Sequence, residues 1–203
     1  MTTIYFIRHS KADKDSIFYR FLSPLKQNMK KKLSKDGISI ARNKLNSNFD
    51  DVEVIYSSNY TRAYQTSLIL SKRLNLKVIK DSKFGERVHG IKKGYNELPK
   101  DFEVRQLKEE NYKINNGESQ KEVRIRMLEA LNNILKNNKN KKIAVFTHST
   151  ALSFLLLNWC SITEDGIYIF NGNVIFDNKW SYCETFKFEF DDDNKLISIK
   201  NIK

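Results

Sequence analysis

The sequence predicts an α/β fold, in which a mostly parallel central sheet is sandwiched between helices and further strands follow at the C-terminal end. Segments with the pattern of strands and segments with the pattern of helices alternate from the N-terminus to residue 157. The runs at residues 4–7 and 143–146 are wholly apolar, which is typical of central strands covered on both faces. With neither an internal repeat nor a linker, residues 1–203 are expected to form a single domain.

The first strand is followed by a polar, lysine-rich stretch, residues 11–32, to which the pattern assigns no element. Ser34 then begins an amphipathic helix, because Ile38, Ala41 and Leu45 recur on one of its faces. Beyond this helix the pattern predicts a strand, a helix and a short strand, at residues 52–56, 60–74 and 76–79.

Residues 82–117 have no clear periodicity and are expected to be irregular, with a short helix near residues 102–108. Ser119 and Glu122 then fit a capping box, in which a hydroxyl and a carboxylate each satisfy a free backbone N–H at the start of a helix. The long helix that follows carries apolar residues at helical spacing, namely Val123, Met127, Leu131 and Ile134.

The strand at residues 143–146 leads into another helix, residues 150–157, after which the chain turns to strands. These tail strands are predicted at residues 167–170, 174–176, 186–190 and 196–199. Residues 191–194, with the sequence Asp-Asp-Asp-Asn, have the composition of a hairpin turn between the last two. Pairing of the tail strands within the chain and across a dimer both fit the pattern, so the oligomeric state stays open.

Composition excludes several classes of protein. The longest apolar run, residues 151–157, is too short to span a membrane. Arg8 and His9 interrupt the N-terminal apolar residues, which argues against a secretory signal. Cys160 and Cys183 are too few for a disulfide framework or a zinc site. We therefore expect a cytoplasmic protein that contacts no membrane.

The formal net charge of +12 arises from 36 Lys and Arg against 24 Asp and Glu. A basic surface attracts phosphate esters, nucleic acid or anionic lipid. However, 27 of the cations are Lys, and they are accompanied by 21 Asn and 20 Ile. Because this joint excess is typical of a biased coding composition, we expect no nucleic-acid partner.

Two of the three histidines follow predicted strands at equivalent positions. His9 comes after the first strand, and His148 comes after the strand at residues 143–146. The carboxyl ends of parallel strands meet at one edge of a sheet, where ligands bind. Arg8 and Arg62 also stand close behind predicted strands, so all four side chains are expected to converge.

Such a cluster is suited to phosphate. Guanidinium groups match phosphate oxygens, and an imidazole between them can attack phosphorus while a second, protonated histidine stabilises the transition state. Helix N-termini expected near Ser10, Asn59 and Ser149 would add backbone N–H groups. The leaving alkoxide also needs a proton, which calls for a carboxylic acid in the site.

Five short motifs occur in a fixed order along the chain. They are Arg8-His9-Ser10 after the first strand, Leu33-Ser34-Lys35-Asp36-Gly37, the serine turn and helix at residues 57–66, Gly117-Glu118-Ser119, and Thr147-His148-Ser149. Together they resemble the histidine phosphatase superfamily, and specifically its phosphoglycerate-mutase-like branch. Their order and spacing fit this family over essentially the whole chain.

The resemblance implies a phosphoglycerate-mutase-like fold and a phosphatase mechanism. By this resemblance His9 is the nucleophile that becomes a phosphohistidine. Arg8, Arg62 and His148 would complete the phosphate pocket, His148 as a catalytic residue as well as a phosphate ligand. The family's proton donor usually lies after the third strand, and Glu86 is the matching carboxylate.

The sequence departs from the family pattern beside both histidines. Ser10 and Lys11 stand where the family often has Gly and an acidic residue, and Ser149-Thr150 follow the second histidine, where Gly is common. Ser10 and Ser149 are still expected to contact phosphate. Arg87 and His89, near the proposed proton donor, are secondary candidates for contact with substrate.

Three functions fit the sequence, and the first two share the residues named above. The first is a phosphatase that hydrolyses small phosphomonoesters, and the second is a 2,3-bisphosphoglycerate-dependent phosphoglycerate mutase, which excludes water. The third is a non-catalytic module that binds phosphorylated ligands or nucleic acid through the lysines at residues 30–32 and 139–142. The short chain and residues 11–32, which do not match the mutase pattern, favour the phosphatase.

Other phosphatase chemistries lack their residues in this chain. Neither Cys160 nor Cys183 lies in a loop closed by an arginine, and no glycine-rich phosphate loop is found. No set of histidines and carboxylates suggests a two-metal site, so no metal and no cofactor are expected. Residues 11–32 and 82–117 are predicted to border the entrance and to determine specificity.

Overall fold

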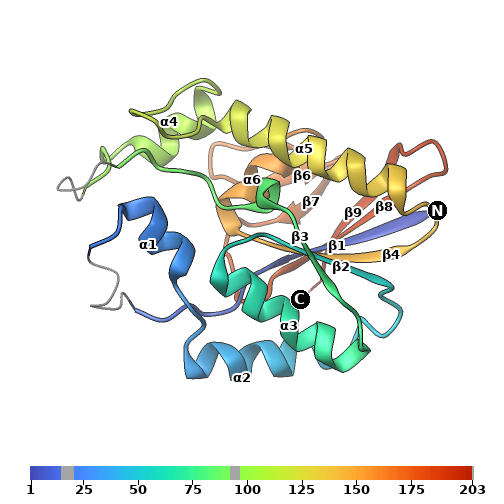
Figure 1. The fold of residues 1–203 in the computed structure, drawn as a ribbon. Coiled ribbons are helices and arrows are strands. Elements are labelled where there is room, and N and C mark those ends of the chain that lie inside the picture. The colour runs from blue at the N-terminus through green and yellow to red at the C-terminus, as the bar shows by residue number, and fades with distance from the viewer. Residues whose placement is uncertain (15–20, 92–96, 203) are drawn as a thin grey trace.

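The structure, a computed structural model, describes residues 1–14, 21–91 and 97–202. Its centre is a six-stranded sheet with the strand order β3-β2-β4-β1-β8-β9 (Figure 1). These strands are β1 (Thr2–Arg8), β2 (Val54–Ser57), β3 (Val78–Lys80), β4 (Lys142–Thr147), β8 (Thr185–Phe190) and β9 (Leu196–Ile202). The strands β1 to β4 are parallel, whereas β8 runs antiparallel to β1 and β9. The prediction of a mostly parallel α/β sheet is confirmed.

Helices cover both faces of this sheet (Figure 1). One face carries α2 (Lys35–Lys44) and α3 (Thr61–Leu74), and the other carries α5 (Gln120–Asn137) and α6 (Ser149–Leu156). The remaining elements are α1 (Pro24–Lys30), the 3-10 helix η2 (Ser82–Phe84), α4 (Phe102–Lys108) and a second sheet of β5 (Ser161–Ile162), β6 (Tyr168–Phe170) and β7 (Asn173–Phe176). None of the helices in the described ranges is both long and apolar enough to cross a bilayer.

The apolar runs of the central strands supply both halves of the core. In β1, Ile4 and Phe6 pack on the side of α5 and α6, while Tyr5 and Ile7 pack on the side of α2 and α3. Successive side chains of a strand point to opposite faces, so a strand covered on both faces has to be apolar at every position. This explains why these strands could be recognised from the sequence.

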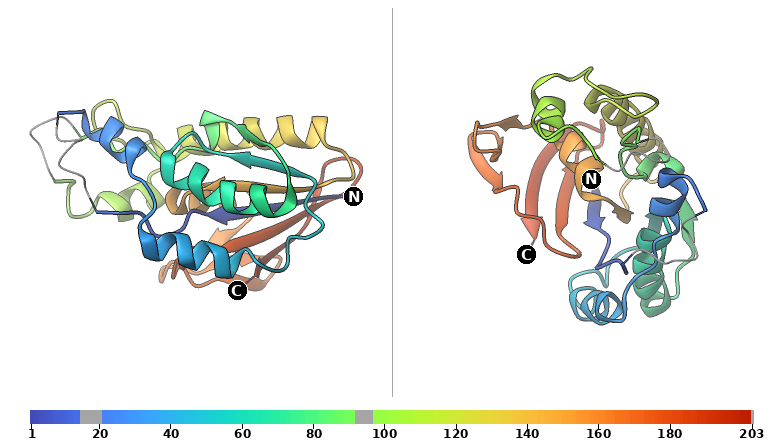
Figure 2. Two further views of the ribbon diagram at one scale, coloured as in Figure 1. Left: turned by 60° about the horizontal axis from the view of Figure 1, so that its bottom comes forward. Right: turned by 90° about the vertical axis from the view of Figure 1, so that its left-hand side faces the viewer.

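The carboxyl ends of the parallel strands point away from the N-terminus, toward the left of Figure 1. Helix α1 lies at this end, and the right-hand view of Figure 2 looks onto it. Ser23 caps α1 by accepting the N–H of Lys26, and Pro24 occupies its first turn. The sequence analysis assigned no element here, because the helix has no buried residue and therefore no apolar stripe.

Three other local expectations were tested by the structure. The capping box is confirmed, since Ser119 and Glu122 exchange both hydrogen bonds at the start of α5. No helix begins near Ser10, because the chain there stays extended and ties to α2 and α3. Ile38 is 38% exposed and not in the core, because α2 turns Gly37 toward the backbone of Lys11, where a Cβ atom would clash. The two-residue strand β5 was also not predicted.

Asparagine forms most of the left-handed turns. Eight non-glycine residues in the described ranges have a positive φ, and seven of them are Asn48, Asn75, Asn115, Asn140, Asn171, Asn178 and Asn194. Asn75, for example, ends α3 in this conformation. The predicted hairpin turn at residues 191–194 also forms, and its left-handed residue is Asn194.

Candidate active site

Three neighbouring strand ends bring the predicted residues together at one edge of the sheet. His9 follows β1, and its backbone N–H donates to the carbonyl of Thr147 in β4, 3.0 Å away. His148 directly follows β4, and Ser58 follows β2, which pairs with β4 on its other side. The rings of His9 and His148 meet edge to face, with centroids 5.1 Å apart.

The ring of His9 is held in one orientation by hydrogen bonds to both of its nitrogens. Nδ1 lies 2.7 Å from the carbonyl oxygen of Ser10, which can only accept, so Nδ1 carries the proton. Nε2 therefore has a lone pair, and it accepts a hydrogen bond of 2.9 Å from Nε of Arg62. Burial, together with the charge of Arg62, lowers the pKa of His9 well below its usual value of 6.5. The site thus holds a neutral imidazole whose lone pair is on Nε2, where it accepts the N–H of Arg62.

His148 is fully buried and has one nitrogen without a partner. Its Nε2 lies 2.8 Å from the hydroxyl oxygen of Ser58, which also accepts the N–H of Tyr60. If the Ser58 hydroxyl donates to Nε2, the proton of the neutral ring is on Nδ1, which contacts no acceptor among the described residues. Burial, followed by the charge of Arg62, lowers the pKa of His148 well below 6.5.

Arg62 connects His9 to α1. It projects from the first turn of α3, and its guanidinium lies over the ring of Tyr60, 5.0 Å from the ring centroid. Besides the bond to His9, its Nη1 donates to the main-chain carbonyl of Asn28 in α1, 2.6 Å away. Burial lowers the pKa of this guanidinium. A bound anion would therefore have to replace Nε2 of His9 or the carbonyl of Asn28 as a hydrogen-bond partner of Arg62.

Arg8 ends β1 and contacts the segment before β8. Its guanidinium lies 6.0 Å from the ring centroid of Trp180 and 5.4 Å from that of Tyr182, and Nη1 donates to the carbonyl of Ser181, 3.1 Å away. Its Nε is buried and has no partner in the described part of the chain. Burial also lowers the pKa of Arg8.

The loop after η2 places Glu86 at the first turn of α6, the helix that follows His148. Only 9% of the residue is exposed. Its Oε1 accepts two backbone N–H groups, from Arg87 and from Ala151 in the first turn of α6, each at 2.9 Å. Oε2 accepts no hydrogen bond from the residues that the structure describes, so one carboxyl oxygen is fixed and the other is available.

The two predicted serines differ in their surroundings. Ser149 begins α6 directly after His148, at the edge where the site lies. The N–H of Ser10 donates to the Thr66 hydroxyl at 3.1 Å, and its own hydroxyl donates to the carbonyl of Gly37 at 2.7 Å. Both donors of Ser10 are thus occupied, and contact between phosphate and either serine stays a prediction.

The secondary candidates Arg87 and His89 belong to a network that runs from the buried Arg87 to the exposed Glu103. Arg87 forms a two-pronged ion pair with Glu103 of α4, at 2.7 and 2.9 Å, and donates to Nε2 of His89 at 2.9 Å. Burial, and then the charge of Arg87, lowers the pKa of His89. Neither side chain has a contact with the histidine pair.

A cavity of about 400 Å³ borders this network and α1. It is lined by Pro24, Leu25, Asn28 and Lys31 from the α1 region, by residues 87–91, and by Asn115 and Asn116. Residues 11–32 and 82–117 thus both contribute to its wall, and residues 15–20 and 92–96 of those segments lie outside the described ranges. Of the predicted residues only Arg87 and His89 line this cavity, and a larger hollow of about 860 Å³ between β7 and β9 contains none of them. The candidate site is therefore the histidine pair itself, and the smaller cavity is linked to it through Asn28, whose carbonyl contacts Arg62.

The sequence analysis missed several residues of the site. Ser58 was noted only as part of a turn, although it orients His148. No local signal marks Trp180, Tyr182 or Asn28, because their position depends on where β8 and α1 lie in space. The pairing of β8 with β1 is a long-range feature that periodicity cannot reveal.

The arrangement is chemically suited to bind an oxyanion. Two buried donors, Nδ1 of His148 and Nε of Arg8, have no acceptor in the described structure, and a buried unpaired donor is costly. A phosphoryl group has acceptor oxygens on several sides. The described residues include no group of three His, Cys, Asp or Glu placed to hold a metal ion, and a metal-free reaction stays a prediction.

Comparison with known proteins gives a consistent result. A family model described as the histidine phosphatase superfamily (branch 1) matches residues 4–197. Phosphoserine phosphatase 1 of Hydrogenobacter thermophilus is 32% identical to this chain over 111 residues. The match covers 51% of this chain and 52% of that protein, so it spans about half the length of the relative.

Solved structures share the fold at low sequence identity. A phosphoserine phosphatase from Entamoeba histolytica, a mutant in complex with phosphoserine, has a TM-score of 0.68 at 18% identity, with 98% of this chain and 97% of that chain covered. A mycobacterial glucosyl-3-phosphoglycerate phosphatase has a TM-score of 0.67 at 15% identity, with 98% and 96% covered.

Proposed function

This chain belongs to the histidine phosphatase superfamily, and from that premise we propose that it hydrolyses small phosphomonoesters through a phosphohistidine on His9. The observation that carries the proposal is the state of His9. Its Nδ1–H is fixed on the Ser10 carbonyl, so the lone pair is on Nε2, which can attack phosphorus once Arg62 turns to the phosphate. Nδ1 of His148 and Nε of Arg8 have no partner among the described residues, so both are available to donate to the phosphoryl oxygens.

In the first step, Nε2 of His9 forms a bond to phosphorus while the bond between phosphorus and the ester oxygen breaks. The ring becomes positively charged, and the Ser10 carbonyl that accepts the Nδ1–H favours this charge. Arg8, Arg62 and His148 donate to the equatorial oxygens in the transition state. Arg62 releases Nε2 when it turns to phosphate.

Glu86 acts in both steps. It first gives a proton from Oε2 to the departing ester oxygen, which leaves as an alcohol, and Oε1 stays fixed on the N–H groups of Arg87 and Ala151. The carboxylate then accepts a proton from water, whose oxygen attacks phosphorus as the bond to His9 breaks. Inorganic phosphate is released and Glu86 is again protonated.

The alcohol part of the ester would extend toward the cavity of about 400 Å³ beside α1. Its size suits a small molecule. The names of the relatives support substrates of this kind, since one is a phosphoserine phosphatase and another a glucosyl-3-phosphoglycerate phosphatase. O-phosphoserine and 3-phosphoglycerate are therefore the first natural esters to test.

The test is hydrolysis of p-nitrophenyl phosphate in the presence of a metal chelator, with wild type compared with His9→Ala. We expect chelator-resistant activity that falls by more than about 10³-fold in the variant. Activity that survives in a folded His9→Ala variant would place the nucleophile elsewhere. Circular dichroism of both proteins controls for folding.

Stereochemistry tests the phosphohistidine independently. Two successive displacements retain the configuration of a chiral phosphoryl group, whereas direct attack by water inverts it. We expect retention, and inversion would contradict the covalent intermediate. Interconversion of phosphoglycerates without release of phosphate would instead identify a mutase.

A further inference from the structure

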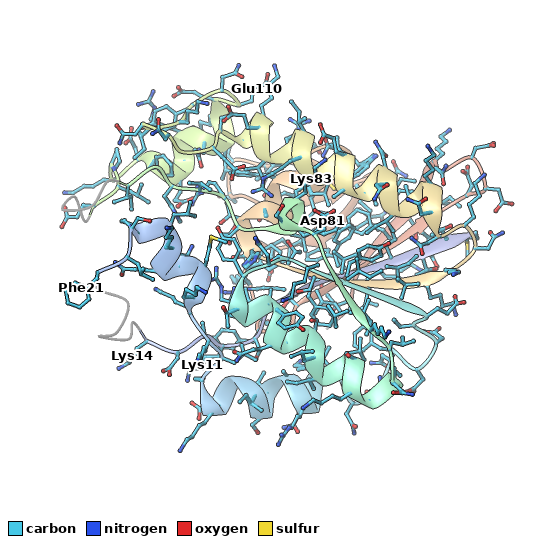
Figure 3. All side chains as sticks on the ribbon, viewed as in Figure 1. Lys11, Lys14, Phe21, Asp81, Lys83 and Glu110 are labelled. Atoms are coloured by element: carbon cyan, nitrogen blue, oxygen red, sulfur yellow. The ribbon has the colours of Figure 1, made fainter. Side chains whose placement is uncertain are left out.

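The loop that carries Glu86 has no regular secondary structure of its own. It follows η2, which lies between α5 and the sheet, and Figure 3 labels Asp81 and Lys83 at this place. A proton donor has to be held within a few tenths of an ångström of its working position, and a loop does not provide this by itself. Contacts from outside the loop must therefore hold its backbone.

Arg126 of α5 donates to three main-chain carbonyls of this loop. Its Nη1 lies 2.6 Å from the carbonyl oxygen of Lys83 and 2.9 Å from that of Gly85, and its Nη2 lies 3.3 Å from that of Glu86. The intervening carbonyl, of Phe84, accepts the hydroxyl of Thr147 in β4, 2.8 Å away. Four consecutive carbonyls are thus held by side chains from α5 and β4.

Glu118 completes the arrangement from the other side. Its carboxylate forms two parallel hydrogen bonds with Arg126, of 2.6 and 2.9 Å, and Oε2 also accepts the N–H of Val88 at 2.9 Å. The N–H of Glu118 donates to the carbonyl of Val88 at 2.8 Å. Both charged residues are largely buried, with 17% and 22% of the side chains of Arg126 and Glu118 exposed.

We propose that the Glu118–Arg126 pair is a positioning device for the proton donor, and this inference rests on the role of Glu86 proposed above. The pair holds the backbone on both sides of Glu86, while Arg87 and Ala151 hold its carboxyl group. This gives a function to Glu118, which the sequence analysis noted only as part of a motif. Arg126 was not noted there at all.

The proposal predicts a dependence on the leaving group. An alkoxide needs a full proton as it departs, whereas p-nitrophenolate is stable enough to leave with little help. The ratio of kcat/KM for an alkyl phosphate such as O-phosphoserine to kcat/KM for p-nitrophenyl phosphate therefore measures proton donation. Because kcat/KM covers only the steps through departure of the leaving group, the later hydrolysis does not enter this ratio.

The reference variant is Glu86→Gln, for which we expect the ratio to fall by about 10²-fold or more. For Arg126→Gln, which loses the donors to the loop, we expect a fall of about 10-fold to 10²-fold. Arg126→Lys keeps the charge and should restore part of the ratio. Arg124→Gln is the matched control, since Arg124 lies on the same helix and contacts Asn158 away from the loop; its ratio should not change.

A charge exchange separates positioning from simple stabilisation. Glu118→Arg combined with Arg126→Glu keeps an ion pair between the same sites, but a carboxylate at residue 126 cannot donate to carbonyls. We expect this double variant to remain as impaired as Arg126→Gln. Recovery of the ratio in the exchanged protein would contradict the proposal.

The outcomes distinguish this inference from the proposed function. If Glu86→Gln lowers both substrates equally, Glu86 is not the proton donor and the proposed mechanism fails. If Glu86→Gln changes the ratio but Arg126→Gln and Arg126→Lys lower both substrates equally, only the positioning role is wrong. Thermal unfolding of each variant identifies the temperature at which all are folded, and the rates are measured below it.

Discussion

The proposed phosphate pocket, built around His9 and His148, and helix α1 both contact Arg62, yet they are built in opposite ways. The pocket stands on β1, β2 and β4, whose side chains are almost all buried, and its histidines are themselves buried. Helix α1 has no buried residue, and it reaches the pocket through one carbonyl, that of Asn28. The comparison teaches that the histidine pair is built into the buried edge of the sheet, whereas α1, which covers it, lies outside the core and contacts Arg62 through a main-chain carbonyl.

The largest effect should follow from damage to the core under the pocket. Phe6 is fully buried, and its ring contacts Phe84 of η2 and Phe188 of β8. Phe6→Ala leaves a cavity in a place that cannot collapse easily, so we expect the free energy of unfolding to fall by about 3 to 5 kcal/mol. Urea denaturation monitored by circular dichroism measures this. A loss below about 1 kcal/mol would mean that the pocket does not depend on this core.

The next largest effect should come from the residue that the two regions share. Arg62→Gln removes a charged donor to phosphate, and we expect kcat/KM to fall by about 10²-fold to 10³-fold for all esters alike. Asn28→Ala is the matched control, because Arg62 contacts the main-chain carbonyl of residue 28 and the substitution keeps it. Steady-state kinetics on p-nitrophenyl phosphate and O-phosphoserine would reveal the opposite pattern, a loss confined to one ester, if Arg62 served specificity.

Acid should lower the free energy of unfolding through the two buried histidines of the pocket. The pKa values of His9 and His148 lie well below 6.5 in the folded protein, while the unfolded chain takes up these protons near pH 6.5. The contribution of these two histidines to the free energy of unfolding is therefore fully present above pH 6.5. It decreases as the pH falls below this value, by up to about 1.4 kcal/mol per pH unit for each histidine. Urea unfolding at pH 7.5, 6.5 and 5.5 measures the slope.

Variants assign this slope to its source. We expect His9→Gln to reduce the slope clearly, and His89→Gln to reduce it less, because the pKa of the partly exposed His89 is lowered less strongly. A slope that responds equally to both substitutions would show that the buried histidine pair is not the main source of the acid sensitivity.

The smallest effect on stability is expected in α1. Leu25 lines the cavity and is 39% exposed, so Leu25→Ala should change the free energy of unfolding by less than about 0.5 kcal/mol. The ratio of kcat/KM for O-phosphoserine to kcat/KM for 3-phosphoglycerate should nevertheless change measurably. The change should be smaller than about tenfold. An unchanged ratio would show that α1 does not contact the alcohol part of the ester. Phe21, which projects outward ahead of α1 (Figure 3), is a control position outside the cavity.

The same contrast explains what could be predicted from the sequence. Local patterns predict the strands at residues 4–7 and 143–146 and the capping box at Ser119. The two strands lie side by side, and their ends bring His9 and His148 together. Helix α1 has no such pattern, because nothing in it is buried. The contacts of Arg126 and Arg8 join segments more than 40 residues apart, at Lys83 and Ser181, and a single sequence contains no periodic signal for them.

The turns show how the chain accommodates its unusual composition. Asparagine is abundant here and is a poor residue for the interior of helices and strands. It is also the residue, after glycine, that most readily adopts a positive φ, and seven of the eight such non-glycine positions in the described ranges are Asn. These seven Asn residues thus do work that glycine usually does, and the chain makes its reversals while containing only 7 glycines.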